Sequence, residues 1–118
     1  MREGRLLHAS SGRILLPQVK RTENAFDRFR GLLCTPEPAP GEGLLLAPCS
    51  SIHMFFMPYP LDILFLDTDG IILSRRQELR PWRIAGERKA AMVLECRAGE
   101  LSCLKLHDGD AVQWQAGR

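Results

Sequence analysis

The stretch from Gly43 to Leu61 contains no Asp, Glu, Lys or Arg, and this uncharged segment limits the possible folds more than any other feature of the chain. Its length approaches that of a membrane-spanning helix. Prolines at positions 48, 58 and 60 interrupt it, and Ser50, Ser51 and His53 add polar groups. Because proline removes backbone donors and breaks a helix, this segment could not satisfy its backbone in lipid. We therefore predict that it is buried, or lines a pocket, in a water-soluble fold.

The remaining sequence predicts short strands joined by turns. The DTDG sequence at 67–70 is the clearest turn, because glycine tolerates positive φ and aspartate is favoured beside it. An SSG cluster at 10–12 predicts an N-terminal hairpin, whose second strand Pro17 weakens or confines to a sheet edge. Residues 63–66 are apolar on both faces, which indicates a central strand. The expected strands are 5–8, 13–16, 44–47, 63–66, 71–73, 79–84, 91–96 and 111–115.

Two helices are also expected. Thr22 can cap the first, and its apolar face recurs at three- and four-residue spacing through Phe26, Phe29, Leu32 and Leu33. Residues 98–104 supply one or two further helical turns. At 118 residues, the default is one domain spanning residues 1–118. The predicted fold class is α+β, mostly β, with a small curled or barrel-like sheet and two short helices.

The charge balance bears on the class of partner. The formal net charge of +2 is too small to indicate a polyanion, so no nucleic-acid partner is expected. Residues 75–89 nevertheless hold six basic and two acidic side chains. This local bias has two interpretations, a solvated hairpin face or a patch for an anion or an acidic partner.

Cysteine usage and the first residues indicate the compartment. None of the four cysteines forms a CxxC pair, so neither a zinc ribbon nor a thioredoxin-type site is indicated. The chain opens with polar residues and no apolar targeting core, so we expect a cytoplasmic protein with reduced thiols. Cys49, His53 and His107 together supply fewer ligands than structural zinc needs. No metal or cofactor is expected.

Three polar residues near the uncharged segment are candidates for chemistry. His53 and Asp62 flank a proline-braced loop, where an imidazole near a carboxylate could act as acid or base. Arg30, at the end of the first expected helix, could pair with a carboxylate of the protein or of a ligand. The structural alternative is that Asp62 accepts bonds from backbone amides of the nearby bend, or that Arg30 pairs with Asp62 or Glu95.

The sequence Arg80-Pro81-Trp82-Arg83 is the most informative surface feature. A tryptophan between two arginines, fixed by proline, could stack on a sugar or an aromatic group, or anchor a protein partner. The alternative is a tryptophan at the start of a strand that covers the open end of a barrel, with the arginines in solvent.

Several motifs occur together in one order: RFRGL at 28–32, IHMFFMPYPLDILFLD at 52–67, LRPWR at 79–83 and VLE at 93–95. With these motifs the chain resembles the DUF192 (UPF0127) family over about Val19 to Trp114. The resemblance implies a small β-barrel-like α+β domain and adds no reaction, cofactor or partner. Met54 stands where relatives often carry threonine, so a hydroxyl there is not essential in this chain.

Three functional hypotheses remain open. The first is a non-catalytic module that binds a small molecule or a protein through the 52–62 loop and the 80–83 segment, with Arg30, His53, Asp62, Arg80, Trp82 and Arg83 as contact residues. The second is a small hydrolase- or transferase-like enzyme that uses His53, Asp62 and Arg30. The third is a structural protein that self-associates through an apolar patch. The sequence leaves the ligand and the oligomeric state open.

Overall fold

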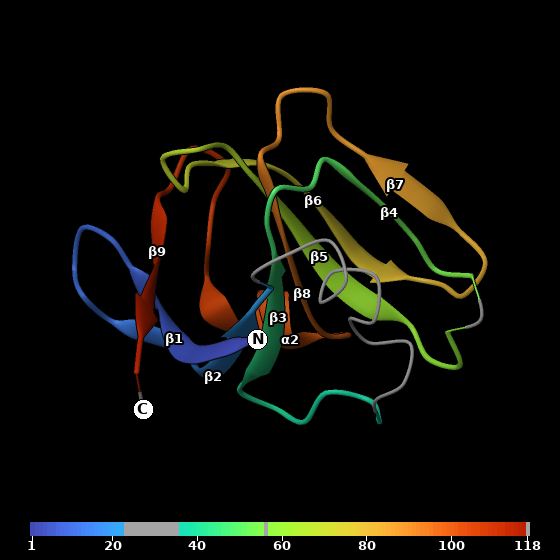
Figure 1. Ribbon diagram of the computed structural model, residues 1–118, viewed down its shortest axis with the longest axis horizontal. Helices are drawn as coiled ribbons and strands as arrows, with labels where there is room; N and C mark the ends of the chain where they lie inside the picture. The colour runs from blue at the N-terminus through green and yellow to red at the C-terminus, as the bar shows by residue number, and fades with distance from the viewer. Residues whose placement is uncertain (23–35, 56, 118) are drawn as a thin grey trace.

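The computed structural model describes residues 1–22, 36–55 and 57–117, and its main feature is one curled sheet (Figure 1). The described elements are strands β1 (Arg2–His8), β2 (Ile14–Arg21), β3 (Glu42–Leu46), β4 (Ser51–His53), β5 (Leu61–Leu66), β6 (Ile72–Leu79), β7 (Ile84–Gly86), β8 (Met92–Arg97) and β9 (Val112–Ala116), and helix α2 (Glu100–Leu104). Among these residues, α2 is the only helix, and it is too short to cross a membrane.

Seven strands make the main sheet in the order β6-β5-β8-β3-β2-β1-β9, and β4 pairs with β7 in a separate small sheet. All pairings are antiparallel except that of β2 with β3. The six residues of β5 are all buried, which confirms the predicted central strand, here flanked by β6 and β8. The fold is therefore α+β and mostly β, as predicted.

The sheet curls without closing into a full barrel. Its edge strands β6 and β9 approach each other at the Ile71–Ala111 bridge, which lies outside both strands. Backbone bonds from Ile72 N to Asp110 O and from Val112 N to Gly70 O support that contact. The barrel-like prediction is therefore correct in curvature but not in closure.

The two faces of the curled sheet bury different cores. Side chains alternate between faces along a strand, so Leu94 and Cys96 of β8 point inward while Val93 points outward. The inner core is the concave side and includes α2; its residues are Leu6, Leu15, Leu16, Val19, Leu45, Leu64, Leu66, Ile72, Leu94, Cys96, Leu101, Leu104, Leu106 and Val112. The outer core lies between the sheet and the β4–β7 pair; its residues are Leu44, Leu46, Ile52, Met54, Met57, Tyr59, Leu61, Ile63, Phe65, Ala85 and Val93.

The turn at 67–70 is confirmed. Oδ1 of Asp67 accepts the backbone N–H groups of Asp69 and Ile71 at 2.8 and 2.9 Å. Gly70 has φ +81°, and a Cβ there would collide with the carbonyl oxygen of Val112. Glycine is required at this position for both reasons.

The expectation for Pro17 needs correction, and the first expected helix falls almost entirely outside the described residues. Pro17 lies in the interior of β2, which pairs on both sides, so β2 is not an edge strand. The β1–β2 register shifts between the Gly4–Val19 and Leu6–Leu16 pairs, and Pro17 occupies this irregularity, where the ladder needs no donor from it. The first expected helix, apart from Thr22, lies outside the described residues. The Oγ1 of buried Thr22 accepts the N–H of Ala47 at 3.2 Å.

Candidate functional site

The small β4–β7 sheet separates the outer core from solvent. Ile52 pairs with Ala85, and both side chains are buried in the outer core. The alternating residues His53 and Ile84 also pair with each other, and they face outward. This two-residue periodicity leaves an apolar Ile84 side chain 69% exposed.

Backbone hydrogen bonds bring the 52–57 segment and the 80–83 segment together. The N–H of Trp82 donates to Met54 O, and the N–H of Met54 donates to Arg83 O, both at 2.7 Å. Trp82 has φ +69°, a left-handed conformation that is unusual for a large side chain. Such a conformation costs about 1–3 kcal/mol and persists only where the surroundings impose it. The backbone therefore fixes the direction in which the Trp82 side chain, which is 58% exposed, leaves the chain.

The aromatic rings of these segments form a continuous row. The rings of His53 and Phe55 stack with centroids 4.8 Å apart, and those of Phe55 and Trp82 are 5.7 Å apart. We call His53, Phe55, Trp82 and Ile84 the exposed ridge. Trp82 and Ile84 are the two most exposed large hydrophobic side chains among the described residues. Exposed apolar groups gathered in this way mark interaction surfaces more often than scattered ones do.

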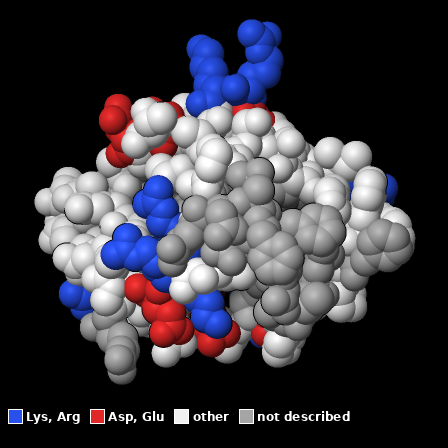
Figure 2. All heavy atoms as spheres, viewed as in Figure 1, with Lys and Arg blue, Asp and Glu red and all other residues white. Residues whose placement is uncertain are grey.

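Basic side chains flank Trp82 and extend into the loop that follows β7. Arg80 and Arg83 are exposed next to Trp82, and Arg88 and Lys89 are exposed in the loop between β7 and β8. Figure 2 shows basic side chains projecting from the end of the molecule where Figure 1 places that loop. None of these four forms an ion pair within the part of the chain that the structure describes. Arg75, by contrast, pairs with Asp108 at 3.2 Å.

Asp62 has a structural role. It is fully buried, its Oδ1 accepts the N–H of Glu78 at 2.7 Å, and its Oδ2 accepts those of Gly99 and Leu101 at 3.0 Å. The carboxylate thus fixes the start of α2 and the end of β6. These amides come from distant elements and not from the Pro58–Pro60 bend that the sequence suggested.

The structure does not support the pairing of His53 with Asp62 as acid and base. Asp62 points into the inner core, whereas His53 lies in the exposed ridge and its Nδ1 accepts the N–H of Phe55 at 3.3 Å. A general base needs access to substrate, and the Asp62 oxygens are occupied by three backbone amides. Arg30, the third member of that hypothesis, lies outside the described residues.

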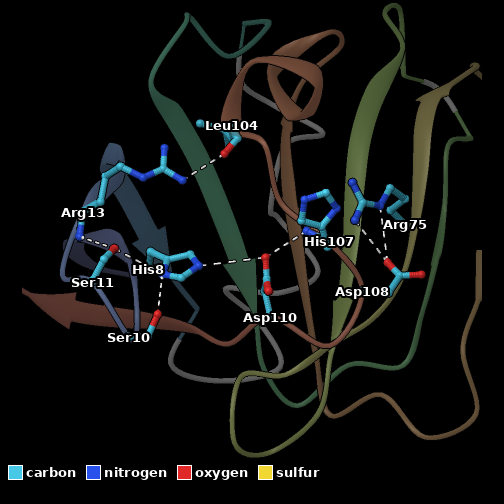
Figure 3. Close-up of polar contacts among 9 residues, drawn as sticks. All are labelled: His8, Ser10, Ser11, Arg13, Arg75, Leu104, His107, Asp108 and Asp110. Atoms are coloured by element: carbon cyan, nitrogen blue, oxygen red, sulfur yellow. Dashed lines mark hydrogen bonds and ion pairs between the residues drawn. The ribbon is translucent and has the colours of Figure 1, made fainter.

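A second polar cluster, which sequence inspection missed, lies at the β1–β2 turn (Figure 3). The hydroxyls of Ser10 and Ser11 lie 3.1 and 3.2 Å from Nδ1 of His8, and Nε2 of His8 lies 3.9 Å from Asp110. These residue types match a nucleophile–base–carboxylate set. Both serines are exposed, and the separation between His8 and Asp110 exceeds a hydrogen bond. Oδ2 of Asp110 instead accepts the N–H of His107 at 2.9 Å, so we interpret the cluster as a turn-stabilising network.

Glu95 is the buried carboxyl group of the outer face. It lies between Leu44 of β3 and Ile63 of β5, and burial raises its pKa from 4.5 to about 7. Raised carboxyl pKa values also occur in catalytic acids. The residue is only 7% exposed, however, which restricts access to any substrate. The protonation of Glu95 therefore affects stability between pH 4.5 and about 7.

The described residues offer no metal centre. No group of three or more His, Cys, Asp or Glu side chains in that part of the chain is arranged to hold a metal ion. The thiol of Cys49, one of the ligands considered from the sequence, donates to the carbonyl oxygen of Ser51 at 3.1 Å.

Comparisons with known proteins agree with the observed fold. The family model DUF192, described as "Uncharacterized ACR, COG1430", matches residues 7–114. A UPF0127 protein of Thermococcus sibiricus is 32% identical over 118 residues, covering 93% of this chain and 74% of that protein. A UPF0127 protein of Thermococcus kodakarensis is 26% identical over 114 residues, covering 92% and 72%.

Two solved structures are similar throughout. A protein of Sinorhizobium meliloti 1021, named a "putative transcription regulator", superposes with a TM-score of 0.79 at 29% identity, covering 96% of this chain and 92% of that one. A protein of unknown function from Novosphingobium aromaticivorans gives a TM-score of 0.74 at 23% identity, covering 95% and 84%. The second similarity concerns the fold alone.

Proposed function

The chain belongs to the DUF192 family, and we propose that it is a non-catalytic binding module whose exposed ridge docks an acidic, partly apolar segment of a partner protein. The observation that carries this proposal is the continuous row His53–Phe55–Trp82, held in place by the left-handed backbone at Trp82. A rigid aromatic side chain loses little conformational entropy on binding, and tryptophan is enriched among residues that dominate interface energies.

Charge complementarity supports an acidic partner. Arg80 and Arg83 adjoin Trp82 in the chain, and Arg88 and Lys89 lie in the loop after β7; none of the four has a carboxylate partner among the described residues. Basic side chains at the rim of an interface accelerate encounter with an acidic surface and disfavour basic ones. They also disfavour self-association through the exposed ridge, because two copies would bring like charges together.

A protein partner fits this surface better than nucleic acid does. Ile84 is the most exposed large hydrophobic side chain among the described residues and offers an aliphatic contact, whereas bases are bound by stacking on aromatic rings. The net charge of +2 is also small for a protein that must neutralise several phosphates. The Sinorhizobium meliloti relative is named in connection with transcription, so nucleic acid is included in the test.

The test is a binding titration with synthetic probes. Three kinds of fluorescently labelled probe are compared by anisotropy. The first are peptides in which acidic residues alternate with leucine and phenylalanine, and the second are the same peptides with lysine in place of the acids. The third are single- and double-stranded DNA. We expect the acidic peptides to bind and the other probes to bind at least about tenfold more weakly. Stronger binding of DNA or of the basic peptides would contradict the proposal, and so would the absence of binding by the acidic peptides.

Two variants locate the contact. Trp82→Ala is expected to weaken acidic-peptide binding by about thirtyfold, while the free energy of unfolding stays within about 1 kcal/mol of wild type. Ile14→Ala is the matched control, because Ile14 is a 50% exposed hydrophobic side chain on β2. Its binding should be unchanged. If Trp82→Ala unfolds the domain, or if both variants lose binding equally, the exposed ridge is not the contact surface.

A further inference from the structure

A second candidate site lies at the mouth of the curled sheet, on the inner face and not on the exposed ridge. Helix α2 fills one end of the inner core, where Asp62 at the start of β5 holds it. At the other end, beyond Leu66, a cavity of about 220 Å³ opens between the β5–β6 turn and β9. The mouth of a β-barrel is a frequent position for small-ligand sites.

The cavity combines an apolar floor with a polar rim. The floor consists of inner-core residues and one half-buried neighbour: Leu6, Leu45, Leu66, Met92 and Val112. Arg21 of β2, Asp69 of the turn and Trp114 of β9 contribute to the rim. The volume is below the roughly 300–1,000 Å³ of pockets for drug-sized ligands, so the cavity suits a molecule smaller than a nucleotide.

Arg21, the arginine at the rim, faces another arginine on the neighbouring strand β1. Arg21 lies directly opposite Arg2 in the β1–β2 pairing, whereas the adjacent pair, Glu3 with Lys20, has opposite charges. Like charges directly opposite each other destabilise a pair of strands. Neither arginine has an ion-pair partner within the described residues. A bound anion would relieve the repulsion between them.

Both guanidinium groups lie over the ring of Trp114. The guanidinium carbons of Arg2 and Arg21 lie 5.5 and 5.6 Å from the centroid of the Trp114 ring. The indole Nε1 donates to Val19 O at 2.9 Å, and a Cβ on Gly4 would come within 2.8 Å of the ring. The ring therefore packs directly on the backbone of β1 and cannot shift. A guanidinium stacked in this way keeps its in-plane N–H donors for a carboxylate.

We propose that this cavity binds a small organic carboxylate with a short aliphatic group, its carboxylate on Arg21 and its aliphatic part on the apolar floor. The Arg21 fork matches the planar geometry of a carboxylate. Asp69 at the rim repels more highly charged anions, which favours a single carboxylate over phosphate. Neither argument depends on the exposed ridge.

The test uses the fluorescence of Trp114. The chain has two tryptophans, so Trp82→Phe leaves Trp114 as the sole indole reporter. Isocaproate is the probe, and inorganic phosphate and isoamylamine are the comparisons, the latter carrying a similar aliphatic group on a cation. We expect isocaproate to change the emission saturably, with phosphate and isoamylamine at least about tenfold weaker.

Charge variants in the Trp82→Phe background then assign the contact. Arg21→Gln should weaken isocaproate binding by at least about tenfold. Lys20→Gln, on the opposite face of the same strand, should leave the affinity unchanged. Because Arg21→Gln removes a like-charge pair, its melting temperature should equal or exceed that of the Trp82→Phe protein. If the melting temperature falls instead, Arg2→Gln serves as the second charge variant. No saturable change with isocaproate, phosphate binding of equal strength, or an affinity that Arg21→Gln does not alter would overturn the proposal.

Discussion

Replacing Glu95 with glutamine should stabilise this protein at neutral and alkaline pH and have little effect in acid. Glu95 lies between Leu44 and Ile63 in the middle of the main sheet, and burial raises its pKa from 4.5 to about 7. The folded protein therefore holds this proton more tightly than the unfolded chain does. The stabilisation is fully present below pH 4.5 and is lost as the pH rises through about 7.

The size of the effect follows from the pKa shift. One pKa unit corresponds to about 1.4 kcal/mol, so the shift of Glu95 amounts to about 3 kcal/mol in the free energy of unfolding. Glutamine has nearly the same shape and cannot ionise. The variant should therefore match wild type near pH 4.5 and exceed it by about 3 kcal/mol above pH 7.

Urea unfolding, followed by circular dichroism over that pH range, measures this difference. Other ionisable groups titrate alike in both proteins, so their contributions cancel in the comparison. Glu3→Gln is the control, because Glu3 is exposed on β1 and should show no comparable change with pH. If the free energies of unfolding of Glu95→Gln and wild type differ by the same amount at every pH, the reasoning is refuted.

Three further predictions concern backbone contacts. Asp62→Asn should lower the free energy of unfolding by about 3 kcal/mol in urea titrations, because an amide cannot accept all three backbone N–H bonds. A loss below about 0.5 kcal/mol would contradict the structural role of Asp62. Because Trp82 has φ +69°, the Trp82→Gly variant should be more stable than Trp82→Ala by about 1 kcal/mol and should have the higher melting temperature. The reverse order would mean that the left-handed backbone is not present. Gly70→Ala should lower the free energy of unfolding by at least about 2 kcal/mol and Gly109→Ala by about 1 kcal/mol, because both glycines have positive φ but only a Cβ at position 70 would collide with Val112. Equal losses for the two variants in chemical unfolding would contradict the collision with Val112.

The uncharged segment shows what the sequence could predict. Its prolines and polar groups excluded a continuous helix, and the structure has most of β3, the short strand β4 and the first residue of β5 there. The DTDG turn and the strand expected at 91–96, which is β8, were also predicted, because local φ preferences and apolar residue patterns determine them. The Pro17 prediction failed because the irregular register that accommodates this residue depends on β1.

The candidate sites depend on contacts that no local pattern encodes. Asp62 was identified as important, but its partners are 16, 37 and 39 residues away, so its structural role was not visible from neighbouring residues. Arg21 and Trp114 were not recognised at all. The only available signal was a pair of arginines near the ends of two adjoining strands, and its meaning required the register that places Arg2 opposite Arg21.

The most direct test of the binding surface uses the two indole N–H signals in a ¹⁵N-resolved NMR titration with the acidic peptides. The Trp82 side chain is 58% exposed in the exposed ridge, whereas the Trp114 indole donates to Val19 O at the rim of the separate cavity, so its signal reports binding there and not at the ridge. We predict that the acidic peptides shift the Trp82 indole signal and leave that of Trp114 in place. A shift of the Trp114 signal alone, or of neither, would contradict the assignment of the exposed ridge as the binding surface.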